Sequence, residues 1–187
     1  MGDSIIDGVG AKQMSRSMAV TAAREVAATT GRRVEFEIVG LSGATSTSIR
    51  SELLPQVVGS GFDFVVVSAG VNDVTGRTRT SGWRREMCAL IDELTRDSPD
   101  AHVLTCGLPP LGRFPLLPAP LRSFIGVRAR TLDRILAEVA SQREQVTWLP
   151  TDFDASPEKF AADGYHPNSE SHEEWGRRVG EALLARR

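Results

Sequence analysis

The sequence places a serine close to its first residue and an aspartate–histidine pair close to its last ones. Ser4 stands in Gly-Asp-Ser-Ile at positions 2–5, and Asp163 and His166 stand in Asp-Gly-Tyr-His-Pro-Asn at positions 163–168. A serine hydroxyl is a useful nucleophile only when a base removes its proton, and the base works best when a carboxylate orients it. These residues therefore predict a nucleophile, a base and an orienting acid, with Ser4 as the nucleophile.

His166 is the best candidate for the base among the three histidines of the chain. His102 opens a predicted strand and is interpreted as a structural or surface residue. His172 lies one turn into the last predicted helix beside two glutamates, where we expect it to be solvated. His166 precedes a proline in a loop, and its three-residue spacing from Asp163 allows a tight turn to bring the carboxyl group onto Nδ1.

Two further segments carry candidate hydrogen-bond donors for an oxyanion, namely Ser-Gly at 42–43 and Gly-Val-Asn-Asp at 70–73. A glycine lets a backbone N–H group approach a reacting centre closely, which favours Gly43. Asn72 offers a neutral side-chain donor that has no competing proton equilibrium. Each segment alone reads as an ordinary turn. Together with the N–H of Ser4, they predict an oxyanion hole.

The hydrophobic pattern alternates between strand and helix along the chain. Strands are predicted at 33–39, 62–68, 102–106 and 146–149, and helices at 11–30, from 47 or 48 onward, at 81–96, at 121–142 and at 169–185. Such alternation implies right-handed crossovers and a mostly parallel sheet with helices on both faces. Ligands of these sheets bind beyond the carboxyl ends of the strands. The candidate groups from residue 43 onward all follow predicted strands, so we expect them at that edge.

Ser4 should also follow a strand, yet only three residues precede it. A domain of this type carries an apolar strand of about five residues at that place. We interpret the first strand as truncated in this chain, and an export signal would be lost with it. The alternative is a fold that runs without this strand, which would weaken core packing and leave neighbouring strand edges unpaired.

The composition is that of one globular domain spanning residues 1–187. Hydrophobic residues make up 41% of the 187 residues and charged residues 25%, which excludes disordered and fibrous classes. The formal net charge of -2 gives no basic footprint for nucleic acid. No apolar run approaches the length of a transmembrane helix and no signal peptide is visible, so we expect a cytoplasmic protein.

No residue pattern indicates a metal or a cofactor. The acids and histidines show no two-His-one-carboxylate set, and no phosphate-binding loop with its lysine is present. Cys88 and Cys106 lack the spacing of a zinc site, and we expect both to be buried and reduced.

The four segments together resemble the SGNH hydrolases, the GDSL esterase/lipase family. They match the family's blocks in order across the whole chain, as Gly2-Asp3-Ser4-Ile5, Gly43, Gly70-Val71-Asn72-Asp73 and Asp163-Gly164-Tyr165-His166, with Ile5 standing where the family has leucine. The resemblance implies a flavodoxin-like, three-layer α/β/α sandwich with a parallel sheet of order 2-1-3-4-5. It also implies a catalytic triad of Ser4, Asp163 and His166, and an oxyanion hole lined by Ser4, Gly43 and Asn72.

We therefore predict a serine esterase that hydrolyses small-molecule carboxylic esters with short or medium acyl groups through an acyl-Ser4 intermediate. The proline-rich loop at 107–120 carries Leu108, Leu111, Phe114, Leu116 and Leu117, which either rim an acyl pocket or pack on the following helix. Alternatives on the same site are a thioesterase, a carbohydrate deacetylase and an acyltransferase. A non-catalytic α/β binding module is the alternative of another class. The physiological substrate and the oligomeric state stay open.

Overall fold

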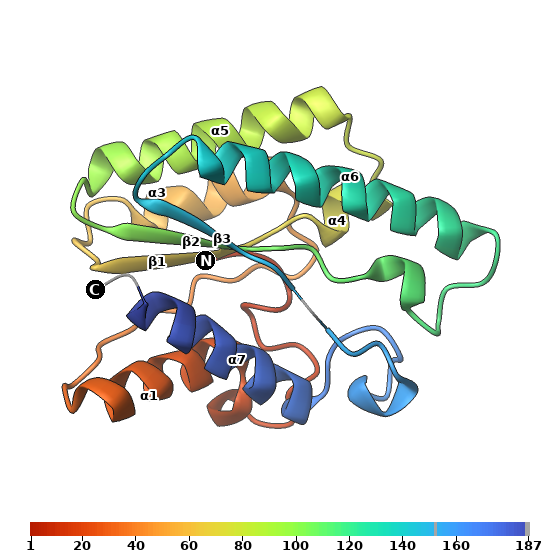
Figure 1. Ribbon diagram of the computed structural model, residues 1–187, viewed down its shortest axis with the longest axis horizontal. Coiled ribbons are helices and arrows are strands. Elements are labelled where there is room, and N and C mark those ends of the chain that lie inside the picture. Colours follow the sequence, from red (N-terminus) through yellow and green to blue (C-terminus); the bar gives the residue numbers. More distant parts are fainter. Residues whose placement is uncertain (152, 186–187) are drawn as a thin grey trace.

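The structure is a computed structural model that describes residues 1–151 and 153–185, and it has three layers (Figure 1). The middle layer is a parallel sheet in the order β1-β2-β3, formed by β1 (Phe64–Ser68), β2 (His102–Cys106) and β3 (Val146–Leu149). Its register pairs Val66 with Leu104 and Leu104 with Thr147. The second, third and fourth strands predicted from the sequence are therefore confirmed.

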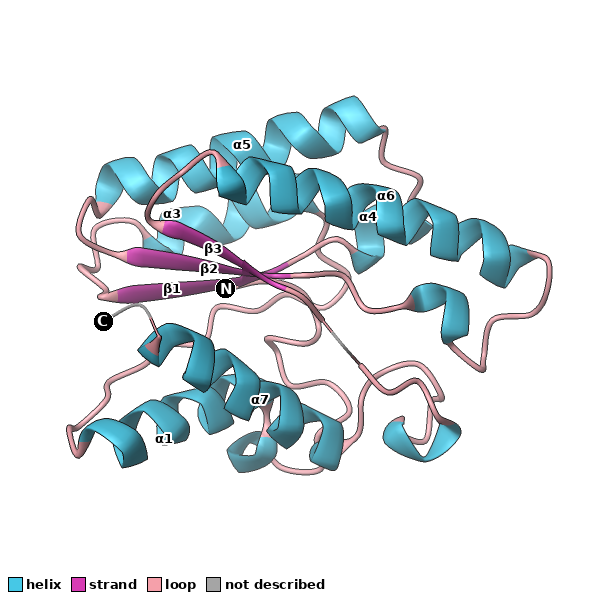
Figure 2. Ribbon diagram, viewed as in Figure 1, coloured by secondary structure: helices cyan, strands magenta, loops and turns pink. Residues whose placement is uncertain are grey.

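Helices cover both faces of this sheet (Figure 2). The long helices are α1 (Met18–Thr30) and α7 (Ser169–Leu184) on one face, and α5 (Thr80–Asp97) and α6 (Leu121–Ser141) on the other. The short ones are α2 (Ser46–Ser48), α3 (Leu54–Val57) and α4 (Val71–Thr75), a π-helical turn at Ile49–Leu53 and 3-10 turns at Met14–Arg16, Leu111–Arg113 and Pro157–Lys159. The predicted three-layer α/β/α sandwich is confirmed.

Apolar burial explains how the layers hold together. Trp83 and Leu90 of α5 are fully buried against the sheet, as is Leu132 of α6. On the other face, Met18 of α1 and Val179 of α7 are fully buried against β2, where Leu104 lies in the same apolar cluster. Each helix thus presents one apolar stripe to a strand layer that is apolar on both sides, as expected for a parallel sheet.

The first three residues of the chain take the sheet position of a first strand. Gly2 forms parallel bridges to Gly40 on one side and to Ser68 on the other. Its N–H donates to the Val39 carbonyl at 3.0 Å, and the N–H of Asp3 donates to the Ser68 carbonyl at 3.2 Å. β1, β2 and β3 thus correspond to positions 3, 4 and 5 of the predicted order 2-1-3-4-5, Gly2 lies at position 1, and position 2 is reached only at Gly40.

The strand predicted at 33–39 is wrong, because these residues form no regular secondary structure. Its backbone pairs with Gly2 only at its end, where Gly2 N–H donates to the Val39 carbonyl and Leu41 N–H donates to the Gly2 carbonyl. Without a partner a strand cannot complete its ladder of backbone hydrogen bonds. A groove of about 770 Å³ lies beside the segment, and Met1, Val34, Val66 and Val179 are among the residues that line it.

The starts of two helices and the predicted cap of a third differ from the prediction. The helix predicted from Thr47 or Ser48 begins after Thr45, whose hydroxyl accepts from Ser48 N–H in a reciprocal capping box. The first predicted helix begins at Met18 instead of residue 11, with Ser17 as its cap. The last helix is capped by Asn168, not by Ser169. None of the helices in residues 1–151 and 153–185 combines the length and the hydropathy that crossing a bilayer requires.

Candidate active site

Ser4, His166 and Asp163 form a continuous row of hydrogen bonds at the carboxyl edge of the sheet. The Oγ of Ser4 lies 3.1 Å from Nε2 of His166, and Nδ1 of His166 lies 2.7 Å from Oδ2 of Asp163. An imidazole that carries its proton on Nδ1, facing the carboxylate, has Nε2 free to accept the hydroxyl proton. The two ends of the chain are thus brought together in the geometry that a nucleophile, a base and an orienting acid require.

A tight turn holds Asp163 against the histidine. Gly164 adopts a left-handed φ of 65°, and Oδ1 of Asp163 accepts the backbone N–H groups of Tyr165 at 2.9 Å and of His166 at 3.0 Å. Burial acts to raise the pKa of Asp163, but the hydrogen bonds from Tyr165 and His166 outweigh it and lower the pKa to about 2. The carboxyl group is therefore ionised at neutral pH and suited to stabilise an imidazolium.

Ser4 is placed by the close contact between its loop and β1. Gly2 has a φ of 156°, and a Cβ at this position would lie 2.1 Å from the carbonyl oxygen of Ser68, so no larger residue fits. Beyond Ser4 the chain turns back on itself, with the N–H of Val9 donating to the Ser4 carbonyl at 2.9 Å. The nucleophile thus projects from a loop that is fixed on both sides.

Asp3 is a buried acid beside the nucleophile that the sequence analysis gave no role. Its side chain is 2% exposed and accepts a hydrogen bond from the Ile5 N–H at 3.1 Å. Burial raises the pKa of Asp3 to about 6, although the Ile5 hydrogen bond and the nearby His166 act in the opposite direction. Its burial could have been predicted from the sequence, because Asp3 directly precedes the nucleophile in a stretch that must pack against a strand.

Gly43 has a φ of 84°, in the left-handed region, and a Cβ there would meet no atom within 4 Å. The left-handed backbone conformation by itself favours glycine here, a reason in addition to the one given from the sequence. Within the described part of the chain, the N–H groups of Ser4 and Gly43 donate to no protein acceptor.

Asn72 lies at the start of α4, which the sequence analysis did not predict as a helix. Its Nδ2 donates to the Ala44 carbonyl at 2.9 Å, so it is adjacent to the loop that carries Gly43. That loop is also connected to the nucleophile loop, because the Ser42 hydroxyl donates to Oδ2 of Asp7 at 3.0 Å. The three predicted donors are thus carried by segments that contact one another.

A small cavity of about 30 Å³ opens beside Ser4 and His166. Its remaining walls include the apolar side chains of Val71, Pro109 and Phe114. Phe114 is 4% exposed and packs edge-on against Phe160, with ring centroids 4.9 Å apart. The rings around the cavity therefore support one another and give it a rigid apolar wall.

The apolar residues of the loop at 107–120 were expected either to rim an acyl pocket or to pack on the following helix, and the structure shows both arrangements. Phe114 lines the cavity, whereas Leu108 and Leu111 are buried in the core cluster with α6 and Leu116 is 57% exposed. Leu117 is half-buried against the same core cluster. Oδ1 of Asp133 in α6 accepts the Leu108 N–H at 2.9 Å, which anchors the start of the loop.

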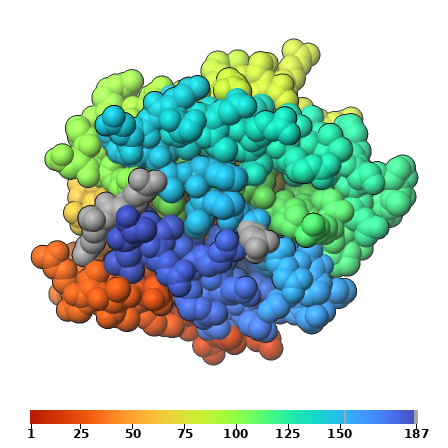
Figure 3. All heavy atoms as spheres, viewed as in Figure 1, coloured from red at the N-terminus to blue at the C-terminus, as the bar shows by residue number. Residues whose placement is uncertain are grey.

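The two loops that flank the site, near residues 110 and 160, meet at one end of the molecule. In the face shown in Figure 3, residues near 160 lie against α7 and next to the green residues near 110. The contact between Phe114 and Phe160 joins the same two stretches. Both stretches follow strands, β2 and β3, as the rule for ligand sites in parallel sheets requires.

His172 is fully buried, which contradicts the expectation that it is solvated. Its Nδ1 accepts the Met18 N–H at 3.2 Å and its Nε2 donates to the Val9 carbonyl at 2.9 Å, so it ties α7 to α1 and to the nucleophile loop. Burial lowers its pKa. The missed signal is its spacing of three residues from Trp175 and seven from Val179, which places all three buried side chains on one helix face.

The cysteines offer no rival nucleophile. Cys106 is buried, and burial raises the pKa of its thiol to about 12, so the reactive thiolate is scarce at neutral pH. Cys88 is half-buried in α5, so the expectation of burial holds fully only for Cys106. The described residues contain no group of three or more His, Cys, Asp or Glu side chains arranged to hold a metal ion.

Comparison with known proteins agrees with this architecture. A structure of TesA matches with a TM-score of 0.79 and 20% identity over 98% of this chain and 96% of that one. The lipase Lip_vut3 from a goat rumen metagenome matches with a TM-score of 0.75 and 15% identity, over 97% and 94% of the two chains. At these identities the likeness shows the fold alone.

Sequence comparison identifies the family. A GDSL-like esterase of Mycobacterium tuberculosis is 29% identical over 178 residues, which cover 91% of this chain and 56% of that protein, so the chain spans about half the length of this relative. The profile of the GDSL-like Lipase/Acylhydrolase family matches residues 1–174. The resemblance drawn from the four segments is thereby confirmed, and the chain belongs to the GDSL-like lipase/acylhydrolase family.

Proposed function

We propose that this protein is a serine esterase that hydrolyses carboxylic esters of short acyl groups through an acyl-Ser4 intermediate. The observation that carries the proposal is the row of hydrogen bonds from Ser4 through His166 to Asp163, with distances of 3.1 and 2.7 Å. Membership of the GDSL-like lipase/acylhydrolase family supports the same reaction class.

The reaction runs in two acyl-transfer steps. The Ser4 Oγ attacks the ester carbonyl carbon while its proton passes to Nε2 of His166, and the N–H groups of Ser4 and Gly43 and the Asn72 amide stabilise the oxyanion. Collapse of this intermediate breaks the bond to the alcohol oxygen, which takes the proton from His166. Water then attacks the acyl-enzyme by the same route, releasing the acid and restoring Ser4.

The size of the cavity favours a short acyl group over a medium one. About 30 Å³ of the cavity beside Ser4 is open to the centre of a water-sized group, which accommodates a small acyl group such as acetyl. The wall residues Val71, Pro109 and Phe114 are apolar and offer no partner for a charged acyl chain. Thioester hydrolysis, carbohydrate deacetylation and acyl transfer remain alternatives on the same residues. Turnover of an aryl acetate, an acyl thioester and an acetylated sugar would separate them.

Labelling with a fluorophosphonate, followed by identification of the modified peptide, tests the nucleophile directly. We expect the label on Ser4, and we expect Ser4→Ala and His166→Ala to lower kcat on an aryl acetate by roughly three decades or more. Ser60→Ala is the matched control, because Ser60 is exposed and precedes β1, at the opposite end of the strand from the site. An unlabelled Ser4, together with a wild-type protein that does not turn over the ester, would instead indicate a binding module.

A further inference from the structure

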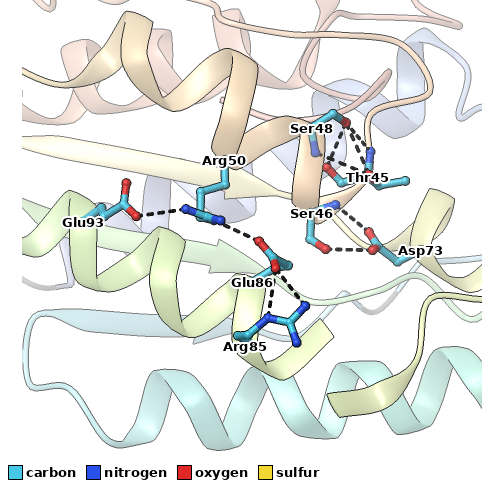
Figure 4. Close-up of polar contacts among 8 residues, drawn as sticks. All are labelled: Thr45, Ser46, Ser48, Arg50, Asp73, Arg85, Glu86 and Glu93. Atoms are coloured by element: carbon cyan, nitrogen blue, oxygen red, sulfur yellow. Dashed lines mark hydrogen bonds and ion pairs between the residues drawn. The ribbon is translucent and has the colours of Figure 1, made fainter. Parts of the chain in front are cut away.

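A buried polar contact joins the two segments that carry Gly43 and Asn72 (Figure 4). Oδ2 of Asp73 accepts the Ser46 N–H at 2.8 Å, and Oδ1 of Asp73 accepts the Ser46 hydroxyl at 2.7 Å. Both residues are 0% exposed. A buried acid that receives two short hydrogen bonds from one residue fixes both the position and the orientation of that residue.

The contact is placed immediately beside the donors on both segments. Asp73 follows Asn72 in the first turn of α4, and Ser46 lies three residues after Gly43. Between Gly43 and Ser46 the chain has little freedom, because the Ala44 N–H donates to the Leu41 carbonyl at 3.0 Å. A shift of Ser46 relative to Asp73 therefore changes the separation between the Gly43 N–H and the Asn72 amide.

The Asn72 amide itself depends on the same alignment. One of its N–H groups donates to the Ala44 carbonyl at 2.9 Å. Because the amide is planar, anchoring one N–H sets the direction of the other, which is the donor assigned to the oxyanion. The Ala44 carbonyl and Ser46 belong to the same short segment. By holding Ser46, Asp73 therefore also fixes the position of the Ala44 carbonyl, which orients the Asn72 amide.

The following residues of this segment are held by a second, separate contact. Arg50 donates to Glu86 at 2.9 Å and to Glu93 at 3.2 Å, which ties the π-helical turn to α5 (Figure 4). This ion pair is partly exposed and lies further along the chain from Gly43. It offers a comparison in which the same segment loses a tertiary contact that does not involve the α4 turn.

We propose that Asp73 is a positioning residue for the oxyanion hole, acting through Ser46 to set the geometry of Gly43 and Asn72. The proposal rests on the proposed esterase function. Asp73 touches no reacting atom. Its contribution is the alignment of two donors that come from different segments and that must converge on one oxygen.

Steady-state kinetics on an aryl acetate test the proposal. We expect Asp73→Ala to lower kcat on the order of 100-fold with KM changed less than threefold, because sub-ångström misplacement of donors weakens stabilisation of the transition state. Asp73→Asn keeps one acceptor for Ser46 and should lose only about tenfold, a partial rescue. Arg50→Met is the matched control, and its kcat should stay within about twofold of the wild type.

A double-mutant cycle separates positioning from a general loss of stability. In an Asn72→Ala background, Asp73→Asn should cost much less than its tenfold effect in the wild type, because the donor that it aims is already absent. The proposal would be overturned if the fold-losses in kcat of Asn72→Ala and Asp73→Asn simply multiplied in the double variant. It would also be overturned by an Asp73→Asn variant that is less stable but retains its kcat. A Ser4→Ala variant that keeps the wild-type kcat would instead refute the proposed acyl-Ser4 mechanism, so the two failures are distinguishable.

Discussion

At the scale of single residues, the site combines acids with opposite electrostatic environments. Asp163 receives hydrogen bonds from Tyr165 and His166 that lower its pKa to about 2, whereas burial raises the pKa of Asp3 to about 6. One carboxyl group is thus kept ionised beside the imidazole, and the other holds its proton more tightly than in the unfolded chain. The two acids make opposite contributions to stability as the pH changes.

The pH dependence of stability tests the environment of Asp3. A raised pKa means that the folded state binds the proton more tightly, so this contribution is present below about pH 4 and is lost as the pH rises through 6. We expect the Tm of the wild type to fall relative to that of Asp3→Asn between pH 4 and 6. Thermal unfolding of both proteins at several pH values measures this, and a constant difference in Tm would contradict it.

At the scale of elements, α1 and α7 pack closely because two glycines face α1. A Cβ on Gly176 would lie 2.6 Å from Cβ of Thr21, and one on Gly180 would lie 2.7 Å from Cβ of Glu25. The close packing matters for the site, because His172 on the same face of α7 holds the Val9 carbonyl of the nucleophile loop.

Glycine-to-alanine substitutions on two helices should therefore have opposite effects. Gly176→Ala should lower the free energy of unfolding by about 1–3 kcal/mol, because the new methyl group forces α1 and α7 apart. Gly82→Ala in α5 should raise it by up to about 1 kcal/mol, since alanine favours the helix and no atom lies closer than 3.8 Å to the added Cβ. Urea unfolding measures both, and a stabilising Gly176→Ala would refute the packing argument.

The elements also show what a sequence pattern can and cannot predict. The strand at His102–Cys106 was predicted with its observed bounds, because a buried parallel strand is recognisable from its own residues. The strand at 33–39 has equally good alternation but forms no ladder, because a strand also needs a neighbour. The sequence likewise did not identify Thr45 and Asn168 as the N-cap residues, because several adjacent Ser, Thr and Asn residues are equally suited to cap a helix.

At the scale of the whole molecule, a groove of about 770 Å³ lies beside Met1. It is lined by apolar residues that include Val34, Val66 and Val179. The Met1 amino nitrogen donates to the Val66 carbonyl at 2.7 Å, and burial lowers the pKa of this amino group to about 6. The low pKa reflects the cost of burying a charged amino group at this place.

Filling the groove should stabilise the fold. An extension of five alternating Val and Ile residues ahead of Met1 should raise the Tm by about 2–8 °C over a Gly-Ser extension of equal length, because apolar area is buried while the fold is unchanged. Both extensions convert the Met1 amine into an amide, so their difference reports apolar filling alone. Equal Tm values would show that the groove does not accept a strand.

The amino-acid sequence by itself determined the reaction class, the candidate residues and the α/β alternation, because each of these depends on residue types and local spacing. Only the tertiary structure decided which polar groups are buried together. Asp3 and Asp73 stand in the motif segments without an assigned role, and His172 was expected to be solvated, yet each is buried and hydrogen-bonded beside the site. Burial and pairing depend on which distant segments pack against each other, and no local pattern contains that information.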